Sequence, residues 1–181
     1  LCDRRQRQMC IRDSILTKCW IFWKKMAIIH IWWNMFKILI DGDGCPVIEE
    51  TLMIAEHFSI PVILVCDSSH SFMHDACEVV ITDKGKDRAD FVILQKVKKD
   101  DIVITQDYGL AALVLSRQAH ALSQNGLRFR DENMLSLLNQ RSDAANIRRQ
   151  RKRYGHMKKR TAQDDKAFLK ALYAVVCELL E

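Results

Sequence analysis

Two aspartates one residue apart, Asp41 and Asp43, stand in the segment ILIDGDGCP at residues 38–46. The apolar run before them predicts a buried strand, so both carboxylates lie where that strand ends. Residues two apart on an extended segment point to the same side, which lets the two carboxylates share one ligand. Carboxylates this close repel each other, and a bound cation would remove the repulsion. One helix cap explains one carboxylate, not two.

Other acidic residues follow other predicted strands. Asp87 and Asp90 in GKDRAD are three apart, which puts both on one face of a helical turn, and Asp107 follows the strand DIVIT. Ligands of an open parallel sheet sit beyond the carboxyl ends of its strands, so we expect one shared site for Mg²⁺ or Mn²⁺, which suit all-oxygen ligands. The structural alternative is that Asp87 and Asp107 each cap the helix that follows. Three further aspartates are expected to be solvated loop charges: Asp83, Asp100 and Asp101.

Short apolar runs alternate with helical stretches, which predicts a PIN-like three-layer α/β/α fold with a mostly parallel central sheet. Strands are predicted at 36–40, 61–66, 77–82, 101–105 and near 120–122. Helices are predicted from Pro46 onward and over 87–97, 109–119, 131–140, 143–153 and 162–180. The inward face of the first helix is predicted to consist of Ile48, Leu52, Ala55 and His57.

Charge is unevenly distributed along the chain, whose formal net charge is +5. Residues 35–140 hold ten basic and sixteen acidic residues, whereas residues 141–160 hold nine basic residues against Asp143 alone. A basic segment beside an acidic body is typical of proteins that bind backbone phosphates, and RNA is the favoured partner. A solvated helix face is the structural alternative. The residues predicted to bind nucleic acid are Arg148, Arg149, Arg151, Lys152, Arg153, Lys158, Lys159 and Arg160.

The first 34 residues differ from the rest, since they contain all four tryptophans and seven basic residues against two acidic ones. Lysines interrupt their apolar stretch, so no run reaches the roughly 20 apolar residues of a membrane span. We predict that residues 1–34 are a non-native or disordered extension, with a peripheral membrane anchor as the alternative. The domain would then be 35–181, divided into an α/β core (35–140) and a basic arm with a C-terminal helix (141–181).

The seven cysteines contain no C-x-x-C pair and no zinc-type spacing. This usage fits a reducing cytoplasm, with no membrane partner. Cys45 lies at the start of a predicted helix, where thiolates are favoured, but the neighbouring carboxylates oppose a thiolate. We therefore expect a structural Cys45 rather than a nucleophile.

Three functions fit the acidic cluster. The pattern at 40–44 resembles the first motif of haloacid dehalogenase-type phosphatases, in which Asp41 would be the nucleophile, although no closing acidic pair follows a suitable strand. A PIN-like nuclease would use Asp41, Asp43, Asp90 and Asp107 as catalytic metal ligands, with Asp87 as a further ligand, to activate water for phosphodiester hydrolysis. The third possibility is a non-catalytic RNA-binding or interaction module.

From residue 35 to the C-terminus the chain resembles the YaiI/YqxD family, a branch of the PIN-like superfamily. The segments that carry the resemblance are IDGDGCPV, DRAD, DIVITQDYGLAALVL and RTAQDDKAFLKAL. Gly42 and Gly44 stand where the family usually has alanine. The resemblance supports the five aspartates as a set. It implies no activity, because the family is functionally uncharacterised, so a metal-dependent nuclease acting on RNA is an expectation from the fold.

Overall fold

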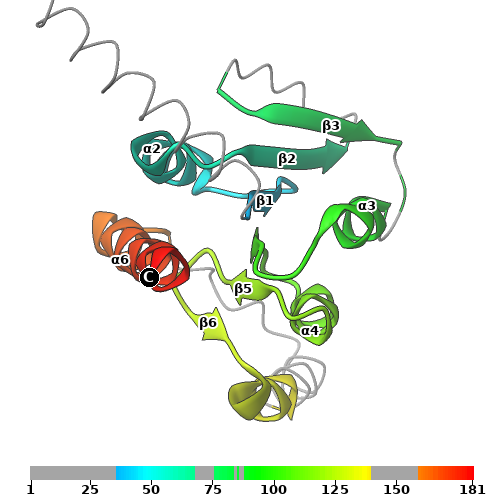
Figure 1. Cartoon of the computed structure of the whole chain (residues 1–181). Helices are drawn as coiled ribbons and strands as arrows, with labels where there is room; N and C mark the ends of the chain where they lie inside the picture. The colour runs from blue at the N-terminus through cyan, green and yellow to red at the C-terminus, as the bar shows by residue number, and fades with distance from the viewer. Residues whose placement is uncertain (1–35, 68–75, 84, 86–87, 140–158) are drawn as a thin grey trace, which may run out of the picture. The chain divides into compact units, whose positions relative to one another are not determined.

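The computed structural model describes residues 36–67, 76–83, 85, 88–139 and 159–181 (Figure 1), all of which belong to one compact unit of the chain, Phe36–Glu181. The predicted extension 1–34, Asp87, the predicted helix 143–153 and the basic residues from Arg148 to Lys158 lie outside the described residues. The domain boundary predicted at residues 34 and 35 stays a prediction.

The chain alternates strands and helices, as the sequence predicts. The strands are β1 (Ile38–Asp41), β2 (Val62–Asp67), β3 (Glu78–Thr82), β4 (Ile102–Ile104), β5 (His120–Leu122) and β6 (Arg128–Phe129). The helices are α2 (Ile48–Phe58), α3 (Arg88–Lys96), α4 (Tyr108–Ser116) and α6 (Ala162–Leu180), and residues 131–139 are also helical.

The strands form one sheet in the order β3-β2-β1-β4-β5-β6. All neighbours are parallel except β6, which runs antiparallel to β5. The three residues of β4 and the first three of β1 are fully buried, as expected for central parallel strands covered on both faces. The predicted α/β class with a mostly parallel sheet is confirmed. β6 was not predicted, because two residues are too few to show an alternating pattern.

Helices cover both faces of this sheet. α2 and α6 lie on one face, and α3 and α4 lie on the other (Figure 1). Alternate residues of β1 divide between the two cores: Ile38 and Ile40 pack with α2 and α6, whereas Leu39 packs with α3 and α4. This alternation is the two-residue period of a strand buried on both sides.

The first helix differs from its prediction in its first residue and in its inward face. α2 begins at Ile48, because Pro46 and Val47 form a turn. His57 is exposed rather than inward, and Thr51 is buried instead, with its hydroxyl donating to the carbonyl of Val47 at 2.7 Å. A local backbone acceptor allows this polar side chain to occupy an inward position.

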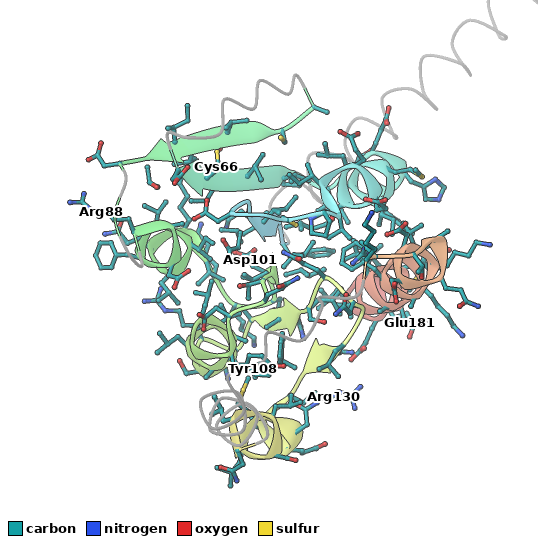
Figure 2. The ribbon with its side chains drawn as sticks, turned by 180° about the vertical axis from the view of Figure 1, so that it is seen from behind. Cys66, Arg88, Asp101, Tyr108, Arg130 and Glu181 are labelled. Atoms are coloured by element: carbon teal, nitrogen blue, oxygen red, sulfur yellow. The ribbon has the colours of Figure 1, made fainter. Side chains whose placement is uncertain are left out.

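Asp101 was predicted to be a solvated loop charge, and this prediction is wrong. The residue is 2% exposed, and Figure 2 shows it among the central elements, with Arg88 at the periphery. One oxygen accepts from the backbone N–H of Lys37 at 2.9 Å, and the other accepts from the Lys37 ammonium at 2.6 Å and from the Lys98 N–H at 2.7 Å. The buried carboxylate therefore ties the entry to β1 to the entry to β4.

In the part of the chain that the structure describes, we find no helix that combines the length and the apolar character of a membrane span.

Candidate functional site

An acidic corner, which we define as Asp41, Asp43, Thr105 and Asp107, lies at the carboxyl ends of β1 and β4. These strands are neighbours, and their register pairs Ile40 with Ile104, so Asp41 and Thr105 come next on adjacent strands. The fully buried Thr105 hydroxyl donates to Asp41 Oδ2 at 2.8 Å and accepts from the backbone N–H of Asp107 at 3.0 Å. One hydroxyl therefore links two carboxylate-bearing segments that are 64 residues apart.

Asp107 is also the N-cap of α4. Its Oδ1 accepts from the N–H of Gly109 at 2.6 Å and from the N–H of Leu110 at 3.4 Å. These bonds satisfy donors that the first turn of a helix leaves without intrahelical partners. The capping alternative is thus confirmed for Asp107.

Asp43 lies on the exposed turn that follows β1. Its Oδ1 accepts from the backbone N–H of Asp67 at 3.3 Å, and the next residue, Gly44, has a positive φ of 72°. The backbone N–H of Asp43 in turn bonds to the carboxylate of Asp41. The glycine-rich turn folds back so that both carboxylates face the end of the strand.

Burial is the main cause that raises the pKa of Asp41 above its ordinary value of 3.8. The negative charges of Asp43 and Asp107 raise it further, while hydrogen bonds from Thr105 and from the Asp43 N–H oppose the shift. Asp43 and Asp107 are therefore both close enough to Asp41 to disfavour its charged form.

Asp90 lies in the first turn of α3 and is half-buried, and Lys159 is exposed. Over residues 36–139 and 159–181, apart from the short undescribed gaps, no group of three or more His, Cys, Asp or Glu side chains is placed to hold a metal ion. The oxygen donors of Asp41 and Asp43 still suit Mg²⁺, which is often held by one or two carboxylates and completes its shell with water and substrate oxygens. The two aspartates thus fit a cation of this kind as a partial ligand set.

Arg160, predicted to bind phosphate, has extensive contacts within the fold. Its guanidinium pairs with Asp165 and donates to the carbonyl of Gln124 at 2.8 Å and to Asn125 Oδ1 at 3.3 Å. Its buried Nη2 has no hydrogen-bond partner among the described residues. Gln124 also accepts from the side chain of Gln106. The start of α6 is therefore fastened to the turn after β5, beside the acidic corner.

Cys45 is half-buried and close enough to both Asp41 and Arg160 to be affected by their charges. Burial raises the pKa of its thiol to about 11, Asp41 raises it as well, and Arg160 opposes the shift. A thiol with this pKa is protonated at neutral pH and is a poor nucleophile. The structural role predicted for Cys45 fits these surroundings.

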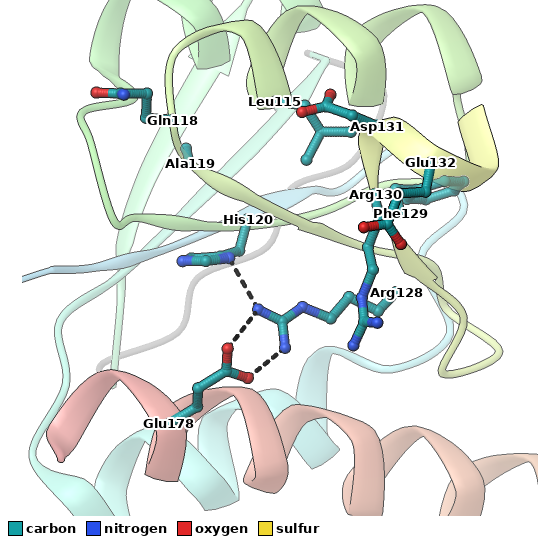
Figure 3. A pocket seen from close by; sticks show the side chains of 10 residues that line it. All are labelled: Leu115, Gln118, Ala119, His120, Arg128, Phe129, Arg130, Asp131, Glu132 and Glu178. Atoms are coloured by element: carbon teal, nitrogen blue, oxygen red, sulfur yellow. Dashed lines mark hydrogen bonds and ion pairs between the residues drawn. The ribbon is translucent and has the colours of Figure 1, made fainter. Parts of the chain in front are cut away.

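A pocket of about 550 Å³ lies at the amino end of β5, opposite the acidic corner (Figure 3). Arg128 spans it, pairing with both carboxylate oxygens of Glu178 on α6 and approaching His120 Nδ1 at 3.2 Å. The contact with the guanidinium requires a neutral His120 whose Nδ1 accepts. These charges satisfy one another and fasten the end of α6 to the sheet.

Neither Thr105 nor the Gln106–Gln124 contact was predicted from the sequence. The available signal was the polar triplet Thr105-Gln106-Asp107 directly after a buried strand, since a polar run at the carboxyl end of a central strand belongs to the ligand-binding edge.

Comparison with known proteins identifies the family of this chain. A model described as "uncharacterized BCR, YaiI/YqxD family" matches residues 39–178. A UPF0178 protein from Alkaliphilus oremlandii is 45% identical over 73% of this chain and 85% of its own length. A UPF0178 protein from Natranaerobius thermophilus is 39% identical over 79% of this chain and 97% of its own length. One from Enterococcus faecalis is 42% identical over 77% of this chain and 97% of its own length.

Among solved structures, the crystal structure of Rae1 (YacP) from Bacillus subtilis is similar, with a TM-score of 0.39 and 15% identity over 81% of this chain and 91% of Rae1. A likeness this distant carries no functional inference. The family model and the relatives, by contrast, cover most of the described domain. The chain belongs to the YaiI/YqxD family.

Proposed function

We propose that the acidic corner binds Mg²⁺ or Mn²⁺ and that the chain hydrolyses phosphodiester bonds, with RNA as the favoured substrate. The observation that carries the proposal is the meeting of Asp41, Asp43 and Asp107 at the carboxyl ends of β1 and β4, where Asp43 and Asp107 add to the rise in the pKa of Asp41 that burial mainly causes. A divalent cation would relieve the repulsion among these carboxylates, which their hydrogen bonds only partly offset.

In this proposal Asp41 and Asp43 are the principal ligands, and Asp87, Asp90 and Asp107 complete the acidic set. Asp107 keeps its N-cap bonds through Oδ1. Thr105 fixes the direction in which Asp41 presents its carboxylate. A bound cation would supply Lewis-acid activation of water and neutralise charge on the phosphate.

The basic residues Arg148–Lys159 would hold the phosphate backbone of the substrate. Arg160 belongs to the same run of positive charge, and it contacts Gln124, whose side chain bonds to Gln106 between Thr105 and Asp107.

A non-catalytic RNA-binding module is the second candidate. The observation that favours it is the double use of Asp107 as a helix cap, together with the lack of a three-ligand group among the described residues. Such a module would have the same acidic turn but would not hydrolyse phosphodiester bonds. It predicts RNA affinity with a steep salt dependence that Asp43→Asn leaves unchanged or increases, because a negative charge is removed.

The test is cleavage of single-stranded RNA and DNA by the purified chain with Mn²⁺, compared with Asp43→Asn. Asp83→Asn is the matched control, because Asp83 is also an exposed loop aspartate. We expect cleavage by the wild type and by the control, and a loss of at least about 100-fold in Asp43→Asn. If the wild type cuts neither polymer, the hydrolase proposal fails.

Two further measurements separate the remaining alternatives. Mn²⁺ binding followed by titration calorimetry should disappear when Asp41 and Asp107 are both replaced by asparagine; binding that survives would refute the cation site itself. A haloacid dehalogenase-type phosphatase would instead form a trapped aspartyl-phosphate on Asp41, which mass spectrometry would detect.

A further inference from the structure

A row of aromatic rings lies on the outer surface where α2 meets α6. The rings of Phe58 and Tyr173 have centroids 5.4 Å apart at an angle of 56°, and His57 lies edge-on to Phe58 at 4.8 Å. The Tyr173 side chain is 50% exposed, His57 is exposed and Phe58 is partly buried. Aromatic side chains that contact one another and remain open to solvent form a ready platform for another planar ring.

Two lysines share the helix face of Tyr173. Lys166, Lys170 and Tyr173 follow the spacing i, i+4 and i+7, which places them in one row along α6. Both lysines are exposed, and within the described residues neither forms an ion pair. Several other basic side chains of the domain, in contrast, are paired with carboxylates: Lys37, Lys96, Arg128 and Arg160.

We propose that these five residues, His57, Phe58, Lys166, Lys170 and Tyr173, form a track for single-stranded RNA. A base would stack on the exposed ring of Tyr173, and its neighbouring phosphates would contact the two lysines. Base–aromatic stacking tolerates any sequence because every base has a π-face, and lysines add a salt-dependent attraction to the backbone.

The charges on the two helices give the bound strand an orientation. α2 exposes Glu49 and Glu56 on its outer side, and these would repel phosphates. α6 exposes Lys166 and Lys170. The phosphate backbone therefore runs along α6, with the bases turned toward α2.

The track also leads toward the acidic corner. α6 begins two residues after Arg160, whose charge acts on Cys45 beside Asp41. From Lys166 to Tyr173 the helix rises about 10 Å. A strand bound on α6 would thus extend from the aromatic rings toward the proposed site of hydrolysis. The inference rests on the proposed function for its choice of RNA, but its test requires no cleavage.

The experiment measures the affinity of the full chain for a labelled single-stranded RNA of about twelve nucleotides, by fluorescence anisotropy in EDTA at several salt concentrations. Tyr173→Ala should weaken binding about tenfold without changing the salt slope. Tyr173→Phe keeps the ring and should bind like the wild type. Lys166→Ala with Lys170→Ala should lower the salt slope by about 1.4, from two lost phosphate contacts.

Matched controls are Phe91→Ala, an exposed aromatic residue on α3, and Lys98→Ala with Lys99→Ala, two exposed lysines on the loop between α3 and β4. We expect these variants to bind like the wild type. If the wild type binds RNA and the Tyr173 and lysine variants bind equally well, the track is wrong, while Mn²⁺-dependent cleavage still tests the proposed function separately. Binding to phosphatidylglycerol vesicles through Tyr173, with no affinity for RNA, would also overturn it, because the partner would then be a membrane surface.

Discussion

Replacing Asp101 with asparagine should remove a large part of the stability of this domain. The carboxylate is almost fully buried and accepts three hydrogen bonds, two from backbone N–H groups and one from the Lys37 ammonium. Removing one partner of a buried ion pair costs about 3–5 kcal/mol, and the 18% exposure of the Lys37 side chain reduces this to about 2–3 kcal/mol. The side-chain NH₂ of the introduced asparagine would also point at a backbone N–H, and these two donors cannot bond to each other. This adds about 1–2 kcal/mol to the loss of stability.

The expected loss is therefore about 4 kcal/mol, compared with a total of about 5–15 kcal/mol for an ordinary domain. Urea unfolding followed by circular dichroism measures it. Asp83→Asn is the control, because the pair with Arg88 is long (3.4 Å) and exposed and should contribute less than about 0.5 kcal/mol. Adding Lys37→Met to Asp101→Asn should recover part of the loss. A cost below about 1 kcal/mol for Asp101→Asn alone would refute the reasoning.

Three further predictions concern other parts of the fold. Thr105→Val should cost about 2 kcal/mol in urea unfolding, because it leaves both Asp41 Oδ2 and the Asp107 N–H without this partner, and Thr105→Ser should restore most of it. Burial and the charge of Arg128 lower the pKa of His120 below 6.5. On acidification the unfolded chain therefore binds a proton before the folded chain does, and the free energy of unfolding should fall as the pH drops below about 6.5. His120→Asn, which keeps an acceptor for Arg128, should remove that part of the pH dependence. Cys45, with a thiol pKa of about 11, should react with iodoacetamide at pH 8 about 100-fold more slowly than a free thiol, as peptide mass spectrometry can show; labelling at the ordinary rate would contradict its burial.

Local patterns in the sequence predicted most of the fold. The apolar runs of β1, β2 and β4 mark buried strands, and the range of α6 agrees with its 3.6-residue pattern. Asp41, Asp43 and Asp107 were predicted to meet because parallel strands end at one edge of a sheet. Asp101 could not be predicted, since its partner Lys37 is 64 residues away and nothing local distinguishes a buried loop aspartate from a solvated one.

Thr105 was missed for a similar reason. Its hydroxyl matters only because the register of β1 with β4 brings it to Asp41, and register is not visible in a single strand. The start of α2 was misplaced because Pro46 suits a turn as well as a first helical turn.

The glycines of the acidic turn restrict how this sequence can change. At Gly44 an added methyl group meets no atom within 4 Å, so only the positive φ opposes it, at about 1 kcal/mol. At Gly42 the methyl group would lie 2.9 Å from the carbonyl oxygen of Val65, which already accepts the N–H of Gly42, and 2.9 Å from Leu64 Cδ1. The Leu64 side chain can retreat, but the carbonyl belongs to the sheet. The two replacements are therefore not equivalent steps in evolution: one is tolerated alone, whereas the other is epistatic and must be accompanied by a shift of β1 against β2.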